Sequence, residues 1–202
     1  MADRLILASA SPRRAELLTL AGIPFEVDPA HVDETATGDD PHPIVQELAK
    51  RKALAVAARR LERLGENAVA SEVVLGADTI VVVDKEVLGK PAGVEEAAGM
   101  LRKLSGRTHG VYGGFYLTRA DGRFHLASDH TTVEFRTLRE REIRAYAASG
   151  EPLDKAGGYA IQGGAAGFVT RLIGSYTNVV GLHLANLIEA LADLSDIEPF
   201  SR

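Results

Sequence analysis

Residues 71–91 read SEVVLGADTIVVVDKEVLGKP, and this stretch carries the strongest fold signal in the chain. Apart from two polar residues, positions 73–83 are apolar or glycine, which is typical of a buried strand. Asp84-Lys85 then predicts a tight turn into a short return strand. Strand and helix signals alternate on both sides of this segment, and the alternation predicts an α/β protein.

Two amphipathic segments flank the buried strand. Upstream, the sequence from His42 to Gly65 repeats apolar residues at helical spacing, and Gly65 is a stop signal. Downstream, the same spacing runs from Val94 to Leu104 and closes at Gly106. Each segment therefore predicts a helix with one apolar face.

The N-terminal stretch LILASASPRRAELL, residues 5–18, predicts a strand, a turn and a helix. Leu5 to Ala8 form the apolar strand, and a Ser-rich turn follows. Ser11 is a natural N-cap and Pro12 takes the first helical position. We expect this helix to end near Gly22.

The rest of the chain continues the alternation. Residues 109–135 predict a hairpin around an Asp-Gly turn, and the sequence TLRE at 137–140 predicts a capping box that opens a helix. A Gly-rich loop and a strand come next, and GLHLANLIEALADL at 181–194 predicts the last helix. No linker, repeat or low-complexity segment interrupts the pattern, so we expect a single domain over residues 1–202.

Composition limits the classes of function. The 202 residues carry a formal net charge of -5, so the chain as a whole does not attract nucleic acid or anionic lipid. Positive charge at a phosphate site must therefore be local. The chain has no cysteine, which excludes disulfides and thiolate metal sites. No apolar run approaches the roughly 18 residues of a membrane span. We expect a cytoplasmic protein that binds neither nucleic acid nor membranes.

Arg13 and Arg14 stand in the first turn of the predicted N-terminal helix, where N–H groups already carry partial positive charge. Cations at this end of a helix cost roughly 0.3–1 kcal/mol each. A bound anion such as phosphate resolves the conflict, because backbone N–H groups, Ser hydroxyls and guanidinium groups then act together. The alternative is that both arginines face solvent or pair with acids elsewhere.

Asp78 interrupts the apolar run of the central strand. An unpaired carboxylate buried there would cost several kcal/mol, so it requires a partner. A metal ion, a lysine or a catalytic proton would each serve, and a buried carboxyl suits a general base. The alternative is a strand that Gly76 breaks early, with Asp78 capping a turn.

Other polar residues stand at positions that can serve a site. Lys52 falls on the apolar face of its helix, although a lysine there commonly extends its ammonium to water. Gln162 offers a donor and an acceptor that could read a base edge, or bond to its own loop. Charged residues in loops or at element ends, where solvated surface charge is the common alternative, are Glu34, Lys90, Glu151, Asp154 and Lys155.

Several enzyme classes lose their main support. The chain has no G-x-x-x-x-G-K-[ST] motif of P-loop ATPases, no G-x-G-x-x-G after a strand as in Rossmann dehydrogenases, and no G-x-S-x-G motif of α/β-hydrolases. The six histidines show no H-x-H or H-x-x-x-H pairing, which argues against zinc. Carboxylate oxygens such as those of Glu34 and Asp78 favour Mg²⁺ or Mn²⁺ held jointly with substrate phosphates.

Seven motifs occur in a characteristic order: S-x-S-P-R-R from Ser9 to Arg14, VDE ending at Glu34, AKRKA around Lys52, GADTIV containing Asp78, GKP around Lys90, LSGRTH ending at His109, and EPLDKAGGYAIQG ending at Gly163. As a set they resemble the Maf family, nucleoside triphosphate pyrophosphatases once described as septum formation inhibitors. With GSYTNVVGLHL, the likeness covers essentially the whole chain. HGVYGGF carries more glycine after SGRTH than the family pattern leads us to expect.

The resemblance implies hydrolysis of the α–β phosphoanhydride of a nucleoside triphosphate, with a divalent metal, Mg²⁺ or Mn²⁺. It implies an elongated α/β mixed-sheet fold like that of inosine triphosphate pyrophosphatases, with two lobes around an active-site cleft, and a homodimer. The DKAGGYAIQG segment is similar to the branch that acts on dTTP and UTP, and it differs from the 7-methyl-GTP branch. A pyrimidine nucleotide, normal or modified, is then the substrate.

The resemblance also implies roles for single residues. The proton acceptor of the family corresponds to Asp78, and its substrate-discriminating positions correspond to Arg13, Thr79 and Gln162. In our interpretation Glu34 and Asp78 hold the metal. The residues we expect to bind substrate are Ser9, Arg13, Arg14, Lys52, Thr79, Lys90, Lys155 and Gln162.

Two rival classes remain open at this point. A nucleotide sensor would use the same basic residues to bind triphosphate without hydrolysis. A different phosphohydrolase, such as a phosphomonoesterase, would release orthophosphate instead of pyrophosphate.

Overall fold

The computed structural model describes residues 3–35 and 38–200. Its strands are β1 (Arg4–Leu7), β2 (Phe25–Val27), β3 (Glu72–Val83), β4 (Glu86–Leu88), β5 (Thr108–Arg119), β6 (Phe124–Phe135) and β7 (Val169–Ile173). Its α-helices are α1 (Pro12–Leu20), α2 (Pro41–Leu64), α3 (Glu66–Val69), α4 (Val94–Leu104), α5 (Glu140–Ala148), α6 (Tyr176–Val180) and α7 (Leu184–Leu194). Three short 3-10 turns cover Glu151–Asp154, Ala156–Gly158 and Gly164–Phe168.

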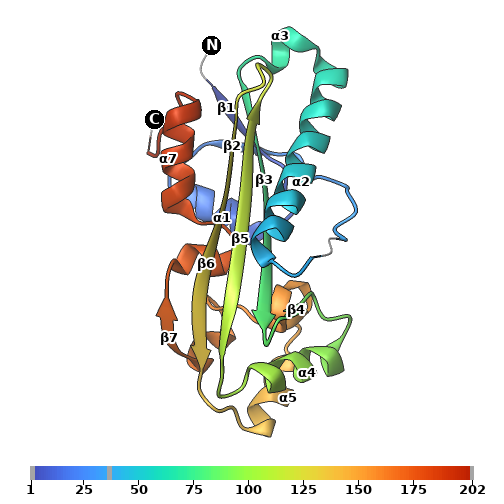
Figure 1. The fold of residues 1–202 in the computed structure, drawn as a ribbon, viewed down its shortest axis with the longest axis vertical. Coiled ribbons are helices and arrows are strands. Elements are labelled where there is room, and N and C mark those ends of the chain that lie inside the picture. The colour runs from blue at the N-terminus through green and yellow to red at the C-terminus, as the bar shows by residue number, and fades with distance from the viewer. Residues whose placement is uncertain (1–2, 36–37, 201–202) are drawn as a thin grey trace. The chain divides into compact units, whose positions relative to one another are not determined.

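The strands form one mixed sheet in the order β2-β1-β3-β5-β6-β7, with β4 paired to β3 (Figure 1). β1 is parallel to β2 and β3, whereas β4 is antiparallel to β3 and β7 is antiparallel to β6. The α/β class and the mixed sheet are therefore confirmed.

The described residues divide into two compact units. Unit 1 lies within Met1–Asp78, Gly113–Asp129 and Gly181–Arg202, and unit 2 within Thr79–Tyr112 and His130–Val180. The boundary falls inside β3, directly after Asp78. That 1–202 is a single domain stays a prediction.

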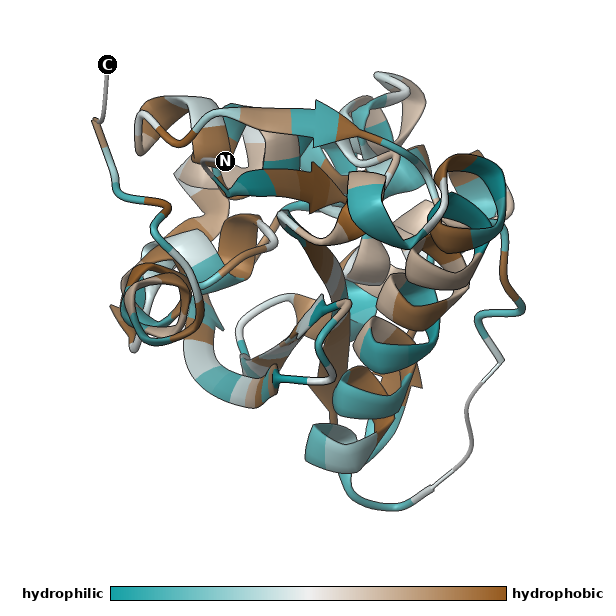
Figure 2. Cartoon of the chain, turned by 90° about the horizontal axis from the view of Figure 1, so that it is seen from above, coloured by the Kyte–Doolittle hydropathy of each residue, from teal (hydrophilic) through white to brown (hydrophobic). Residues whose placement is uncertain are grey.

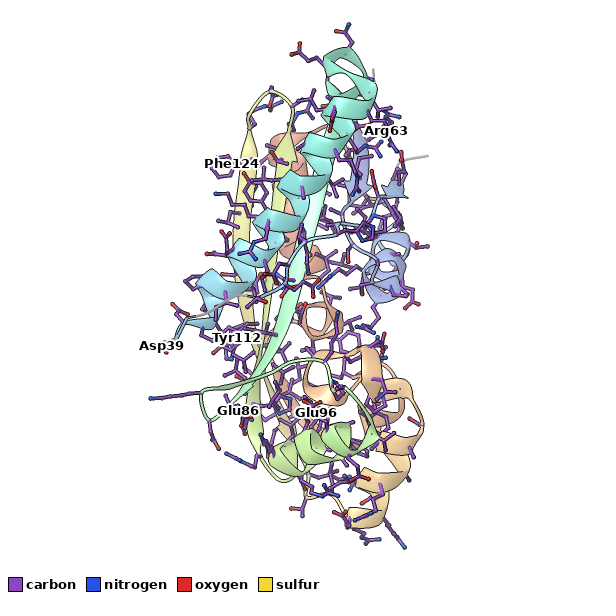
Figure 3. The ribbon with its side chains drawn as sticks, turned by 90° about the vertical axis from the view of Figure 1, so that its right-hand side faces the viewer. Asp39, Arg63, Glu86, Glu96, Tyr112 and Phe124 are labelled. Carbon is purple, nitrogen blue, oxygen red and sulfur yellow. The ribbon has the colours of Figure 1, made fainter. Side chains whose placement is uncertain are left out.

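In unit 1, α2 packs directly on the sheet. A Cβ added to Gly76 would lie 2.1 Å from the carbonyl oxygen of Ala49 and 2.7 Å from the amide nitrogen of Ala53, so only glycine admits the helix this closely. In Figure 3, Asp39 lies just before the first residue of α2 and Arg63 lies in its last turn. Hydrophobic and hydrophilic residues alternate along this helix in Figure 2, as the amphipathic pattern predicts.

Small side chains make the close packing of α2 possible. They form a buried cluster with larger apolar residues from the strands: Ile6, Ala8, Ala49, Ala53, Val56, Val74 and Tyr116. Since small residues bring the helix backbone near the strands, polar groups on the inner face of α2 lie close to β3.

In unit 2, α4 and α5 lie side by side (Figure 1). The loop after α5 packs on β3, because a Cβ on Gly157 would lie 2.9 Å from three atoms of the Val81 side chain. The φ of Gly157 is +71°, a left-handed conformation that glycine adopts without strain. The amide N–H of Gly157 also donates to the carbonyl of Gly89 at 3.0 Å.

Most predicted boundaries are confirmed. α2 ends at Leu64 with Gly65 as its C-cap, and α4 spans the predicted residues. The turn at Asp84-Lys85 has positive φ at both residues, 50° and 69°, as a tight hairpin turn requires. β3 continues past Gly76, so the alternative of an early strand break is wrong.

One capping prediction is confirmed and one needs correction. Ser11 is the N-cap of α1, although its side chain makes no capping hydrogen bond. The N-cap of α5 is Arg139, not Thr137, and Glu142 accepts the Arg139 N–H at 2.9 Å. The helix begins two residues later than the TLRE pattern suggested. The carboxylate that completes the capping box is therefore that of Glu142 and not that of Glu140.

Within residues 3–35 and 38–200, none of the helices is long and apolar enough to cross a lipid bilayer.

Candidate functional site

Three charged side chains meet in unit 1, and we call Glu34, Lys52 and Asp78 the Lys52 cluster. The Lys52 Nζ lies 2.5 Å from Asp78 Oδ1 and 2.8 Å from Glu34 Oε1. The side chains of Lys52 and Asp78 are 7% and 11% exposed, whereas that of Glu34 is 53% exposed. The cluster therefore opens to solvent on its Glu34 side.

Local packing explains why Lys52 reaches Asp78. Lys52 lies between Ala49 and Ala53, the two α2 residues whose backbone passes over Gly76. Asp78 follows Gly76 by two residues, so both side chains leave β3 and α2 close to their point of contact. The sequence left a metal, a lysine or a proton as the partner of Asp78, and in the structure the partner is Lys52.

The ion pair compensates two buried charges, each of which would be unfavourable without its partner. Removing one partner of such a buried pair costs about 3–5 kcal/mol, because the other charge stays buried without compensation. The ammonium of Lys52 faces inward, so the alternative of a lysine extended to water is wrong.

A second group of contacts shapes the turn before α1. Arg14 is buried, and it donates from Nη1 to Ser9 Oγ and from Nε to the carbonyl of Gly181, both at 2.9 Å. Ser9 Oγ also accepts the Ser11 N–H at 3.2 Å. Arg14 thus orders the Ser9–Ser11 turn from inside, while Arg13 beside it is half-buried.

Burial and the neighbouring charges together set the pKa of Arg14. Desolvation lowers the pKa of Arg14, and the negative charges of Asp78 and Glu34 oppose that shift. Arg13 works in the same direction as desolvation. α1 has no acidic residue in its first turn, so its N-terminus stays a region of positive potential.

The Lys52 cluster suits a divalent metal that binds to carboxylates of the protein and to phosphates of a substrate. Glu34 and Asp78 each place a carboxylate oxygen within 2.8 Å of Lys52 Nζ, so the two carboxylates lie close enough together to bind one cation. In the described part of the chain, no three or more His, Asp or Glu residues gather into a metal site. Mg²⁺ commonly binds one or two carboxylates and completes its shell with water and substrate phosphates, so two carboxylates suffice.

The remaining predicted residues lie in unit 2. Thr79 is half-buried on β3, Lys90 is exposed just after β4, and Gln162 is exposed in a turn between the second and third 3-10 segments. Lys155 donates to the carbonyl of Glu151 at 2.7 Å and pairs with Asp154 at 2.5 Å.

The loops that carry these residues are connected inside unit 2. Gly157 packs on Val81, which lies two residues after Thr79. The N–H of Gly157 also donates to the carbonyl of Gly89, the residue before Lys90. The segment with Lys155 and Gln162 therefore lies beside both β3 and the loop after β4.

One buried ionic network was not predicted from the sequence. Arg60 on α2 bonds to Glu72 through Nε and Nη2, each at 2.8 Å, and to Glu26 and Asp28 through Nη1. Hydrogen bonds to Glu72 raise the pKa of Arg60 further above its usual range. Arg60 stands eight residues after Lys52 on α2. Its partners lie on β2, directly after β2 and on β3, so no local sequence pattern indicated the network.

Comparison with known proteins identifies the family. Residues 4–194 match the family described as Maf-like protein. The chain belongs to the Maf family. The resemblance that the motifs carried is thus confirmed over nearly the whole chain.

Curated relatives are similar over nearly their full lengths. A dTTP/UTP pyrophosphatase from Syntrophus aciditrophicus is 47% identical over 199 residues, which cover 98% of this chain and 93% of the relative. One from Geobacter metallireducens is 50% identical over 192 residues, 94% of this chain and 95% of the relative. One from Pelotomaculum thermopropionicum is 49% identical over 189 residues, 93% and 94% of the two chains.

Among solved structures, a nucleoside-triphosphatase (dITP/XTP pyrophosphatase) from Mycobacterium abscessus aligns with a TM-score of 0.37 and 14% identity. The alignment covers 67% of this chain and 75% of that one. A similarity of this size carries no conclusion about this chain.

Proposed function

We propose that this member of the Maf family hydrolyses dTTP and UTP to the nucleoside monophosphate and pyrophosphate. The names of the curated relatives, at 47–50% identity over nearly their whole lengths, support this substrate class. The observation that carries the chemistry is the buried Lys52–Asp78 pair, with its Nζ–Oδ1 distance of 2.5 Å, on an otherwise apolar strand.

In the proposed reaction a water attacks the α-phosphorus. Asp78 takes a proton from this water, the new P–O bond forms, and the bond from the α-phosphorus to the bridging oxygen breaks. The bridging oxygen leaves with the pyrophosphate. Asp78 suits the role because it is a carboxylate held in one position by packing and by Lys52.

Cations of the chain would compensate the charge of the substrate. The N–H groups of the turn before α1 and the side chains of Ser9 and Arg13 suit phosphate oxygens. Arg14 orders this turn through Ser9. We assign Lys52, Lys90 and Lys155 to the remaining phosphate charge.

A divalent cation, Mg²⁺ or Mn²⁺, would be held by Glu34 and Asp78 together with substrate phosphates, and when bound it polarises the α-phosphate. We assign recognition of the base to Thr79 and Gln162, with Arg13 contacting the base or sugar. Polar groups can discriminate strongly between bases, because a wrong base leaves buried donors or acceptors unpaired.

Product analysis tests this function. The purified protein is incubated with Mg²⁺ or Mn²⁺ and with dTTP, UTP, CTP, GTP, ITP or 7-methyl-GTP, and products are separated by ion exchange. We expect monophosphate and pyrophosphate, formed fastest from dTTP and UTP, and no turnover after chelation of the metal.

Other outcomes would redirect the proposal. Turnover confined to 7-methyl-GTP would overturn the specificity and keep the reaction. Release of orthophosphate would indicate a phosphomonoesterase, and saturable binding without products would indicate a nucleotide sensor.

We further propose that the protein acts in the cytoplasm, as a homodimer and as one domain over residues 1–202. The absence of cysteine is compatible with a reducing compartment. Sedimentation of the purified protein tests the dimer, and a monomer at micromolar concentration would contradict it.

A further inference from the structure

Two side chains hold both ends of the short segment that carries Gln162. We call residues 160–164 the Gln162 turn. Tyr146 Oη accepts the N–H of Ala160 at 3.0 Å, and Glu151 accepts the N–H of Gly164 with both carboxylate oxygens at 3.1 Å. Tyr146 Oη in turn donates to Glu151 Oε1 at 3.1 Å. The two ends of the turn are thus connected through a pair of side chains that are bonded to each other.

The turn also fits closely around the carboxylate. A Cβ added to Gly163 would lie 1.9 Å from Glu151 Oε1 and 2.6 Å from its Cδ. A Cβ on Gly164 would lie 3.1 Å from the Tyr146 ring. Glu151 can therefore lie against the turn only because residue 163 has no side chain.

Burial keeps the Tyr146 hydroxyl in its bonding form. Desolvation raises the pKa of this phenol well above its usual range, and the nearby carboxylate of Glu151 acts in the same direction. The ring packs edge-on against Phe168 at 5.3 Å between centroids. Tyr146 is therefore a fixed, protonated donor to Glu151.

The side chains on the turn differ in exposure. Ile161 and Ala160 are buried, whereas Gln162 between Ile161 and Gly163 is exposed. The backbone of the turn is anchored on both sides while its amide side chain faces solvent. A recognition group on a held backbone loses less conformational entropy on binding than one on a mobile loop.

We propose that Tyr146 and Glu151 are positioning residues that set pyrimidine specificity by holding the Gln162 turn. The inference rests on the proposed hydrolysis of dTTP and UTP. Neither residue needs to touch the substrate. Uracil and thymine present an N3–H donor beside carbonyl acceptors, whereas cytosine presents an N3 acceptor beside an amino donor, so a displaced Gln162 amide discriminates between them less well.

The first test compares Tyr146→Phe and Glu151→Gln with the unaltered protein. We expect KM for dTTP and UTP to rise about tenfold, the size of one lost hydrogen bond, with kcat changed by less than about twofold. The preference for UTP over CTP should shrink by a similar factor. Glu151→Gln keeps the size of the side chain and carries the test if Tyr146→Phe does not fold.

A matched control removes the carboxylate of Glu140, the first residue of α5, which lies outside the 3-10 segment that carries Glu151. Glu140 pairs with Arg102 at 2.6 Å on the surface and makes no bond to the turn. Glu140→Gln should leave KM, kcat and the UTP preference unchanged. An equal change in this control would show that loss of a carboxylate that does not contact the turn has the same effect, and would overturn the inference.

A double-mutant cycle separates positioning from general destabilisation. If Tyr146 acts through Gln162, Tyr146→Phe should raise KM in the unaltered protein and have little further effect in a Gln162→Ala background. The same factor in both backgrounds, or an equal loss of kcat on every nucleotide, would overturn the inference.

Amide hydrogen exchange, combined with the activity assays, separates a failure of the positioning role from a failure of the proposed function. In nucleotide-free protein, Tyr146→Phe should speed exchange at Ala160 and Gly164. If the unaltered protein releases no pyrophosphate from dTTP or UTP, the proposed function fails and the specificity role falls with it, whatever the exchange shows. If both are hydrolysed and Tyr146→Phe leaves KM and the UTP preference unchanged, the positioning role alone is wrong.

Discussion

The Lys52 cluster holds its groups in place through buried charge, whereas the Gln162 turn is held by a phenol, one carboxylate and backbone N–H groups. Lys52 and Asp78 are almost fully buried and bind each other, but Gln162 is exposed on a turn whose backbone is anchored. The difference separates two tasks. Proton transfer and charge compensation require buried, oriented charges, while reading a base requires a neutral amide held in a defined position.

The largest expected effect tests the charged region. Asp78→Asn keeps the shape of the side chain and removes the proton acceptor, so kcat should fall by about 10²–10⁴-fold on every nucleotide. The ratio of UTP to CTP turnover should not change, in contrast to substitutions at the Gln162 turn. Pyrophosphate release with dTTP, UTP and CTP measures both quantities, and turnover at the unaltered rate would exclude Asp78 as the base.

A second substitution tests whether the buried Arg60–Glu72 pair in unit 1 contributes to stability alone or also to the reaction. Arg60→Met leaves Glu72, 2% exposed, without its main partner, and should lower the free energy of unfolding by about 3–5 kcal/mol. Activity per folded molecule should stay within about twofold. Urea denaturation and active-site titration provide the two measurements, and a large loss of kcat in folded protein would link this network to catalysis.

Acid sensitivity probes the packing beside the Gln162 turn. His109 is buried against Phe135 and Tyr159, its Nε2 lies 2.8 Å from the Tyr159 hydroxyl, and burial lowers its pKa from 6.5 to about 4. The unfolded chain binds a proton below pH 6.5 that the folded chain refuses until about pH 4. Stability should therefore fall as pH drops through this window, by up to about 3 kcal/mol from this group.

His109→Leu isolates that contribution. The variant loses the bond to Tyr159 at all pH values, but its unfolding free energy should vary less than that of the unaltered protein between pH 6.5 and 4. Denaturation curves at pH 7, 5 and 4 measure the difference in slope, and parallel curves would contradict the assignment.

The smallest effect concerns the metal. Glu34→Gln removes the exposed carboxylate of the Lys52 cluster and leaves Asp78 paired with Lys52. The Mg²⁺ concentration for half-maximal turnover should rise about tenfold, equivalent to about 1.4 kcal/mol of binding free energy. Saturating metal should restore most of kcat, and a loss that no metal concentration restores would give Glu34 a role other than metal binding.

Elements with strong periodicity were predictable. β3, α2 and α4 each carry a long apolar pattern ended by a glycine or a two-residue turn, and their predicted bounds agree with the structure within one or two residues. Short elements such as β2, α3 and α6 were not predicted, because three to five residues give no measurable period. The capping box of α5 was misplaced by two residues, since a Thr and a Glu at the right spacing do not show which turn the helix starts from.

The candidate site was predictable by residue but not by partner. Asp78 was recognised because a carboxylate in an apolar strand needs compensation, and Lys52 because a cation stands on an apolar helix face. That the two compensate each other depends on the close contact of α2 with Gly76, which joins segments far apart in the sequence. That Arg14 binds substrate stays a prediction, and the structure shows its guanidinium bonded to Ser9 and Gly181.

The sequence by itself determined the α/β class, the positions of the long elements, the family and the residue types available for phosphate chemistry. Local pattern suffices for these, because periodicity, stop signals and motif order are properties of neighbouring residues. Only the tertiary structure decided that Lys52 compensates Asp78, that Arg14 supports a turn, and that Tyr146 and Glu151 hold the segment around Gln162. Each of these contacts joins separate elements through packing and hydrogen bonds, and no local pattern in the chain encodes such a distance.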